Sequence, residues 1–152
     1  MLEALLLGAG APSLTNVPMD TISQAQRSEL MSRIRSKDTK PELAVRSILH
    51  RLGYRFRLHR KDLPGRPDIV LPRHHKAVLV HGCFWHGHTC RLASKPKSNT
   101  GYWSEKILKN KERDARNLNA LKEAGWSVLE LWECDVRKMD GLEEQLAAFM
   151  KS

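Results

Sequence analysis

The sequence predicts one α/β domain in which helices flank a central mixed sheet, with a structural zinc site attached. Helical and strand patterns follow in the order helix, three strands, helix, strand, helix. The chain has 152 residues, of which 41% are hydrophobic and 28% charged, a composition that suits one soluble domain with a sizeable core. Residues 80–90 hold three of the seven histidines and two of the three cysteines. A segment that serves only packing does not need so many reactive and metal-binding side chains.

The two ends of the chain differ in character. Residues 1–18 are expected to form a disordered N-terminal tail, and residues 19–152 to form the domain. The apolar run Leu5–Ala11 is too short to span a bilayer and lacks the basic flank of a secretory signal. No later run is apolar enough to span a membrane.

The charge balance favours a polyanionic partner. Lys and Arg number 26 against 17 Asp and Glu, which gives a net charge of +9 and a pI near 9.8. A merely solvated basic surface is the alternative. Three cysteines cannot all pair in disulfides, so their clustering with histidine favours a reducing compartment and a metal.

Local patterns place the elements. Residues 23–37 predict a short basic helix, and Thr39 with Glu42 has the form of a capping box that opens a second helix ending at Gly53. This helix directs Leu43, Val45, Ile48, Leu49 and Leu52 toward the core.

Strands and the remaining helices follow. Period-two alternation predicts a half-buried strand over 54–59, and apolar runs predict strands over 68–71, 77–81 and 126–132. Residues 102–124 predict a long amphipathic helix with a basic polar side, and residues 141–150 a last helix. On the long helix, Asn110 and Asp114 lie four residues apart on one face.

The cysteines and one histidine form a candidate zinc site. Structural zinc takes four sulfur or imidazole ligands, so Cys83, His88, Cys90 and Cys134 could close a tetrahedral set. This spacing is not the usual pair of CxxC knuckles. The alternative is free or buried thiols beside a surface histidine.

Asp68, at the mouth of a strand, is a candidate magnesium ligand. Its hard carboxylate oxygens suit Mg²⁺, which binds through one or two carboxylates together with phosphate oxygens of the substrate. The Pro67-Asp68 dipeptide alone would more often indicate an aspartate in a turn or a cap. The other candidate site residues are what favour a metal ligand here.

Residues 19 to about 151 resemble the very short patch repair (Vsr) DNA mismatch endonucleases. The resemblance rests on separated motifs that occur in one order and nearly fixed spacing, namely Lys37–Glu42, Leu58–Asp68, His81–His88 and Trp126–Cys134. It implies a restriction-endonuclease-like fold. It also implies an enzyme that nicks one strand 5′ of the thymine in a T:G mispair, the product of 5-methylcytosine deamination. The domain of residues 19–152 would then be a Vsr-like endonuclease domain.

The resemblance also implies roles for individual residues. Asp68 matches the family's metal-binding aspartate, and the other active-site positions match Glu42, His81, His86 and Asp114. The zinc ligands match Cys83, His88, Cys90 and Cys134, and the aromatic wedge that enters the duplex matches Phe84, Trp85 and Trp103.

Cofactors and partners follow from the same likeness. Catalytic Mg²⁺ and structural Zn²⁺ are the cofactors, and double-stranded DNA with a T:G mismatch is the substrate. A MutL-type mismatch-repair protein is the further partner, and the chain would act as a monomer in the bacterial cytoplasm, associated with the nucleoid and with no membrane.

A mechanism can be predicted from these residues. Asp68 anchors Mg²⁺ on the scissile phosphate, and His86 exchanges the proton because imidazole titrates near neutral pH. Asp114 would orient His86, while His81 and Glu42 would hold metal-bound waters. The restriction-enzyme pattern would place a lysine on the strand that ends in Val80-His81, so histidine chemistry takes that place here. The competing assignment makes His86 a zinc ligand.

Alternatives of other kinds stay open at this stage. Phe84, Trp85 and Trp103 could pack in the core instead of entering DNA. The whole chain could be a zinc-stabilised DNA-binding module without catalysis, or a restriction-type endonuclease that cuts both strands.

Overall fold

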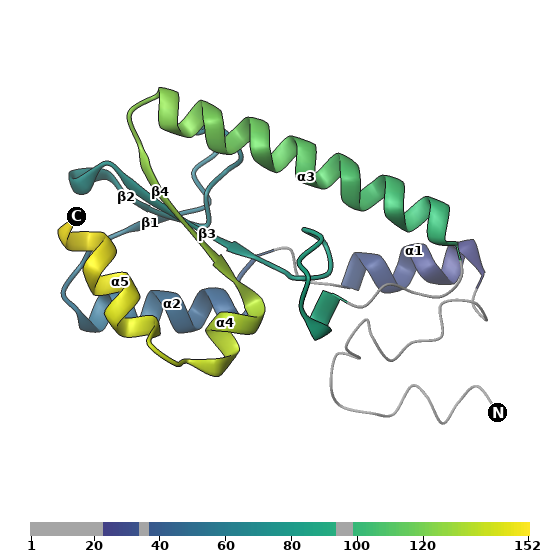
Figure 1. Cartoon of the computed structure of the whole chain (residues 1–152), viewed down its shortest axis with the longest axis horizontal. Helices are drawn as coiled ribbons and strands as arrows, with labels where there is room; N and C mark the ends of the chain where they lie inside the picture. The colour runs from purple at the N-terminus through teal and green to yellow at the C-terminus, as the bar shows by residue number, and fades with distance from the viewer. Residues whose placement is uncertain (1–22, 34–36, 94–98) are drawn as a thin grey trace.

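The computed structural model describes residues 23–33, 37–93 and 99–152, and within them the fold has three layers. Figure 1 shows a twisted sheet with the long helix α3 on one face and helices α2, α4 and α5 on the other. The predicted α/β class with a mixed sheet is therefore confirmed. The tail predicted for residues 1–18 lies outside the described residues.

The first helices follow the predicted signals. Helix α1 spans Gln24–Arg33, and α2 spans Lys40–Arg51. Thr39 is the N-cap of α2, where its hydroxyl accepts a bond from the Glu42 N–H at 3.4 Å. The prediction that Leu43 lies in the core is wrong. Its side chain is 48% exposed, because the buried stripe of α2 runs through Val45, Ile48 and Leu49.

The sheet has strand order β1-β2-β3-β4. Strands β1 (Arg57–Leu58), β2 (Ile69–Leu71) and β3 (Lys76–His81) pair antiparallel, whereas β4 (Ser127–Trp132) pairs parallel to β3. The first strand is shorter than the predicted 54–59 and both of its residues are exposed, so it is an edge strand with little burial.

The main core lies between the sheet and the α2 side. Residues of β2, β3 and β4 pack there against the buried stripe of α2 and against α4 (Glu133–Lys138) and α5 (Leu142–Lys151). Helix α4 was not predicted; it is a six-residue turn of helix that follows β4 directly and buries Val136. On the opposite face, α3 (Thr100–Glu123) buries Trp103, Ile107 and Leu121.

Register brings the functional segments to one end of the sheet. In the parallel pair, His81 stands beside Trp132 and Leu79 beside Glu130. Cross-strand neighbours point to the same face, so His81 and Glu130 both lie on the α3 side where β3 and β4 end. No described helix combines the length and apolarity that crossing a bilayer requires.

Candidate active site and zinc site

Four soft ligand atoms converge at the end of the sheet. Cys83, His88, Cys90 and Cys134 each offer one ligand atom, and these atoms all lie within 4.8 Å of one another. The Cys134 N–H also points to the Cys83 sulfur at 3.4 Å, and the Cys134 sulfur lies 3.5 Å from Nδ1 of His88. This Cys3His group is consistent with a structural zinc ion, whose tetrahedral ligands would stand about as close.

The thiols of this group have strongly altered acidities. Burial raises the pKa of Cys83 to about 12. Burial also opposes ionisation of Cys90, but hydrogen bonds from His88 and Cys83 outweigh it and lower the pKa of that thiol to about 7. One easily ionised thiol among buried partners suits a cation, because metal binding requires thiolates.

The loop that carries these ligands is held from both sides. The His88 ring stacks on Trp132 with centroids 4.3 Å apart and an interplanar angle of 16°. Gly87 has φ +65°, and a Cβ there would lie 2.3 Å from the Lys111 side chain and 2.7 Å from that of Ile107. Only glycine therefore lets the loop pass this close to α3.

His86 points away from the cysteines and toward α3. Its Nδ1 is hydrogen-bonded to Oδ2 of Asp114, and four residues earlier Asn110 donates to the backbone oxygen of Trp85 at 3.0 Å. The two helix positions predicted to share a face thus hold two consecutive loop residues. The structure places His88, not His86, among the cysteine ligands.

His81 completes a second polar group with His86 and Asp114. The ring centroids of His81 and His86 are 4.4 Å apart, and Nε2 of His81 lies 3.0 Å from Oε1 of Glu130. His81 is only 6% exposed. Burial, together with the neighbouring His81, lowers the pKa of His86 below its ordinary value, although Asp114 acts in the opposite direction. A neutral His86 imidazole is therefore favoured.

Asp68 directly precedes β2 and lies across from the end of β3. Its Oδ2 accepts a bond from the Val80 N–H at 2.7 Å, next to His81 in the chain. Burial raises the pKa of Asp68 to about 6, and the nearby negative charge of Glu42 adds to the rise. A carboxylate whose charged form is destabilised by burial and by a like charge would gain from a bound cation, so Asp68 fits the predicted magnesium ligand.

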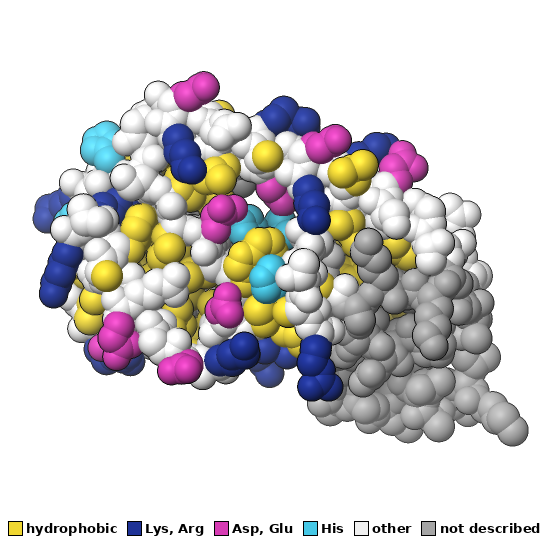
Figure 2. Space-filling view, in the orientation of Figure 1, with side chains coloured by type: hydrophobic (Ala, Val, Ile, Leu, Met, Phe, Trp, Pro, Cys, Tyr) yellow, Lys and Arg dark blue, Asp and Glu magenta, His cyan; other side chains and the backbone are white. Residues whose placement is uncertain are grey.

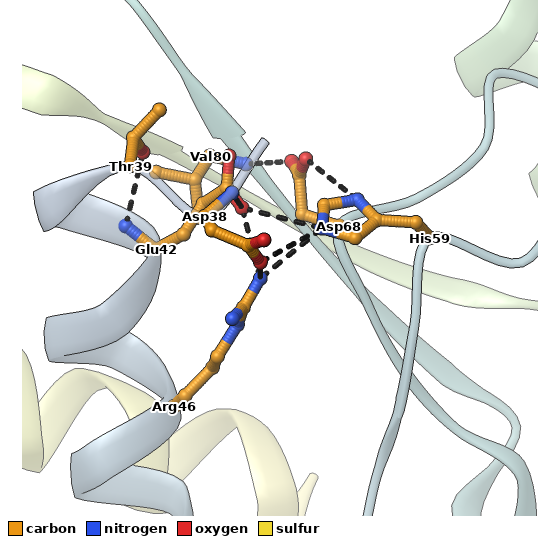
Figure 3. A network of polar contacts seen from close by, with 7 residues as sticks. All are labelled: Asp38, Thr39, Glu42, Arg46, His59, Asp68 and Val80. Carbon is orange, nitrogen blue, oxygen red and sulfur yellow. Dashed lines mark hydrogen bonds and ion pairs between the residues drawn. The ribbon is translucent and has the colours of Figure 1, made fainter. Parts of the chain in front are cut away.

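Glu42 belongs to a third group, on the α2 side of Asp68. It is 2% exposed, and its Oε2 accepts bonds from the Asp38 N–H at 2.9 Å and from Nη2 of Arg46 at 3.1 Å. His59 stands between Glu42 and Asp68, with a ring nitrogen facing each carboxylate, as Figure 3 shows.

The three aromatic residues of the predicted wedge form one cluster. Phe84, Trp85 and Trp103 have ring centroids 5.1 to 6.2 Å apart, and Nζ of Lys106 lies over Trp85 at 5.5 Å. Trp103 is 1% exposed and Phe84 6%, whereas Trp85 is partly exposed. In this structure Phe84 and Trp103 pack as core residues, and Trp85 is the ring of the three that solvent reaches.

Polar chemistry gathers on one face. Figure 2 shows histidine and acidic side chains around a hollow beneath α3, with hydrophobic side chains beside them and Lys and Arg farther out. The basic residues predicted for the polar side of α3 are largely exposed, and they are Lys106, Lys109, Lys111, Arg113 and Arg116. Such a surface suits a phosphate backbone.

Some residues of the site escaped the sequence analysis. His59, Arg46, Asp38 and Glu130 had no predicted role, although each contacts a predicted site residue. Glu130 carried a usable signal, since it is the charged residue of a largely apolar strand. Arg46 and His59 carried none, because basic residues abound in both of their segments.

Comparison with known proteins agrees with this geometry. Residues 19–92 match the family model described as DNA mismatch endonuclease Vsr. The type II nicking enzyme V.XorIIP of Xanthomonas oryzae is 54% identical over 127 residues, which cover 84% of this chain and 93% of that protein. The DNA mismatch endonuclease Vsr of Escherichia coli K12 is 42% identical over 126 residues, 83% of this chain and 81% of that one.

Fold, surface charge and these matches together define a class of protein, a basic α/β endonuclease that acts on DNA. Within that class, the chain belongs to the Vsr family of DNA mismatch endonucleases.

Proposed function

We propose that this endonuclease nicks one strand of DNA 5′ of the thymine in T:G mispairs that arise from deamination of 5-methylcytosine, and so initiates very short patch repair. The observation that carries the proposal is the meeting of two groups at the end of β3. Asp68 is bonded to the Val80 N–H, and the next residue along the strand, His81, opens the group of His81, His86 and Asp114.

The residues divide the work of phosphodiester hydrolysis. Asp68 would hold Mg²⁺, which when bound supplies charge neutralisation at the scissile phosphate. With Nδ1 engaged by Asp114, His86 keeps Nε2 for proton exchange with water or with the leaving oxygen. Glu130 would hold Nε2 of His81, so that the His81 ring stays beside that of His86.

Zinc would have a structural role in this site. Cys83 and His88 flank His86 in the chain, so an ion that joins them to Cys134 would fix the loop that carries the catalytic imidazole. Groups that hold a functional side chain in place in this way are a recurring feature of preorganised sites.

Selectivity for mispairs is assigned to the aromatic cluster. Pushing a ring between base pairs costs a few kcal/mol of stacking, and a mispair offers less resistance than a matched pair. Trp85 is the ring poised to enter DNA, and Phe84 and Trp103 would follow by a local rearrangement. The Nε1–H of Trp103 supports this, because it is buried without a hydrogen-bond partner among the described residues.

Relatives named as nicking enzymes favour single-strand over double-strand cutting. The test uses labelled duplexes that differ only in T:G against C:G, incubated with Mg²⁺ and with either the wild type or Asp68→Ala. We expect a nick 5′ of the mispaired thymine by the wild type alone. Equal cutting of both duplexes would refute mismatch specificity. Cleavage by Asp68→Ala would refute the metal assignment, and no effect of Mg²⁺ would favour a non-catalytic DNA-binding module.

A further inference from the structure

His59 occupies an unusual place between two carboxylates. Its Nε2 lies 3.5 Å from Oε2 of Glu42, and its Nδ1 lies 3.9 Å from Oδ1 of Asp68. The side chain is 25% exposed, so the ring sits partly buried between α2 and the start of β2. Figure 3 shows the imidazole spanning the gap between these two elements.

Arg46 lies against the opposite edge of the His59 ring. Its Nη2 is 3.1 Å from Nε2 of His59, 2.8 Å from Oδ1 of Asp38 and 3.1 Å from Oε2 of Glu42, so its two N–H groups are shared among three neighbours. The other ring nitrogen, Nδ1, faces Asp68. The contact at 3.9 Å is too long for a hydrogen bond, so the ring acts on the carboxylate by its dipole or charge.

Asp38, Glu42 and His59 offer ligand atoms within 4.8 Å of one another, but they do not form a second metal site. The same Nη2 of Arg46 donates to Asp38 at 2.8 Å and to Glu42 at 3.1 Å, and so already supplies a positive charge there. This guanidinium lowers the pKa of Asp38. Asp68 is not bonded to Arg46 among the described residues, and its carboxylate remains the one that a cation would serve.

The backbone of His59 is held in a costly conformation. Its φ is +47°, in the left-handed region that a non-glycine residue rarely adopts and that costs on the order of 1 kcal/mol or more. The His59 N–H donates to the Asp68 backbone oxygen at 3.3 Å, and the adjacent residue Leu58 pairs with Ile69. This pairing fixes His59 opposite Asp68.

We propose that His59 is a positioning residue for Asp68, with Arg46 against the opposite edge of its ring, and that it holds the aspartate carboxylate ready for the divalent cation. The inference rests on the proposed function, since it concerns the same site. Groups of this kind typically change metal affinity or activity by about 10–100-fold when they are removed.

The test compares His59→Leu with His59→Gln. Leucine fills similar space without polar atoms, whereas the glutamine amide can accept from Arg46 and present N–H to Asp68. His50→Leu, the same change at an exposed histidine of α2, is the matched control. Mn²⁺ binding to the zinc-loaded protein without DNA is measured by electron paramagnetic resonance, and nicking of a T:G duplex gives kcat and KM.

We expect His59→Leu to weaken Mn²⁺ binding and to lower kcat by about 10-fold or more, with KM for DNA unchanged. His59→Gln should recover most of both, and His50→Leu should match the wild type. Wild-type values in His59→Leu would overturn the inference. So would an equal loss in both His59 variants together with a lower melting temperature, which would indicate a merely structural role.

The two proposals fail separately. A wild type that binds Mn²⁺ but does not nick the T:G duplex would contradict the proposed function, while the change in Mn²⁺ binding would still decide the role of His59. A wild type that binds no Mn²⁺ at this site would overturn the positioning role itself.

Discussion

The imidazole rings of His81 and His86 lie with their centroids 4.4 Å apart, and each is tied at one edge to a carboxylate. Two protonated rings at this separation would repel each other, so the pair favours at most one positive charge. Because burial and His81 both lower the pKa of His86, the neutral ring is the resting form of His86. It is therefore ready to accept a proton at neutral pH.

The His86–Asp114 pair predicts a non-additive loss of activity. His86→Ala should slow single-turnover nicking by about 10²–10⁴-fold, the usual contribution of a general acid or base. Asp114→Asn should cost less, because it removes only the group that orients the ring. The double variant should be no slower than His86→Ala. A product of the two separate losses would show that Asp114 acts independently of His86.

The Cys3His group predicts that zinc is part of the fold. Cys134→Ser should reduce bound zinc from about one ion per chain to nearly none and lower the melting temperature, because binding free energy at such sites is folding free energy. Metal content by plasma mass spectrometry and melting by circular dichroism check this. His86→Ala is the control and should keep its zinc. If His86→Ala lost zinc while His88→Ala kept it, His86 would be the ligand.

Burial of Asp68 predicts a pH-dependent gain in stability for Asp68→Asn when no magnesium is added. The folded carboxyl keeps its proton up to a pKa of about 6, whereas the unfolded one releases it near 3.8. The wild type therefore loses stability as pH rises between these values. Above pH 6 the variant should be more stable by at most about 3 kcal/mol, at about 1.36 kcal/mol per pKa unit.

Denaturant unfolding at about pH 3 and pH 8 measures this difference. The advantage of Asp68→Asn should nearly vanish at about pH 3, below both pKa values, where the wild-type carboxyl is mostly protonated in the folded and the unfolded state. Added magnesium should stabilise the wild type at pH 8 and leave the variant unchanged. A variant less stable than the wild type at pH 8 without magnesium would show that the charged carboxylate is already satisfied.

Trp85 predicts a selective loss of mismatch recognition. Trp85→Ala should weaken binding to a T:G duplex by about 1–3 kcal/mol, the usual value of a stacked ring, and weaken binding to a C:G duplex much less. Fluorescence anisotropy on the two duplexes measures the difference. Trp126→Ala, at the start of β4 and beside His75, is the control. Equal losses on both duplexes would assign Trp85 to general DNA affinity.

Local patterns predicted much of this fold because they arise from local causes. The N-cap at Thr39 and the face shared by Asn110 and Asp114 depend on residues a few positions apart. The convergence of Cys134 on Cys83 was predicted as well, because the strand predicted over 126–132 ends next to Cys134 at the sheet edge that carries the Cys83 loop.

What the sequence did not predict depends on three-dimensional neighbours. Leu43 was predicted in the core from helical periodicity, but the side of α2 that packs on the sheet carries Val45, Ile48 and Leu49, and Leu43 is exposed. His59 looked like one more basic residue of the half-buried strand predicted over 54–59. Its role depends on a left-handed backbone and on Arg46 from another element, neither of which its local pattern indicates.

The most direct measurement is the position of the cut on each strand of one T:G duplex, labelled on the thymine strand in one reaction and on the guanine strand in another. With magnesium and zinc-loaded wild type, one product is expected, a break in the thymine strand immediately 5′ of the mispaired base. Cleavage of both strands, or a break in the guanine strand, would contradict the account.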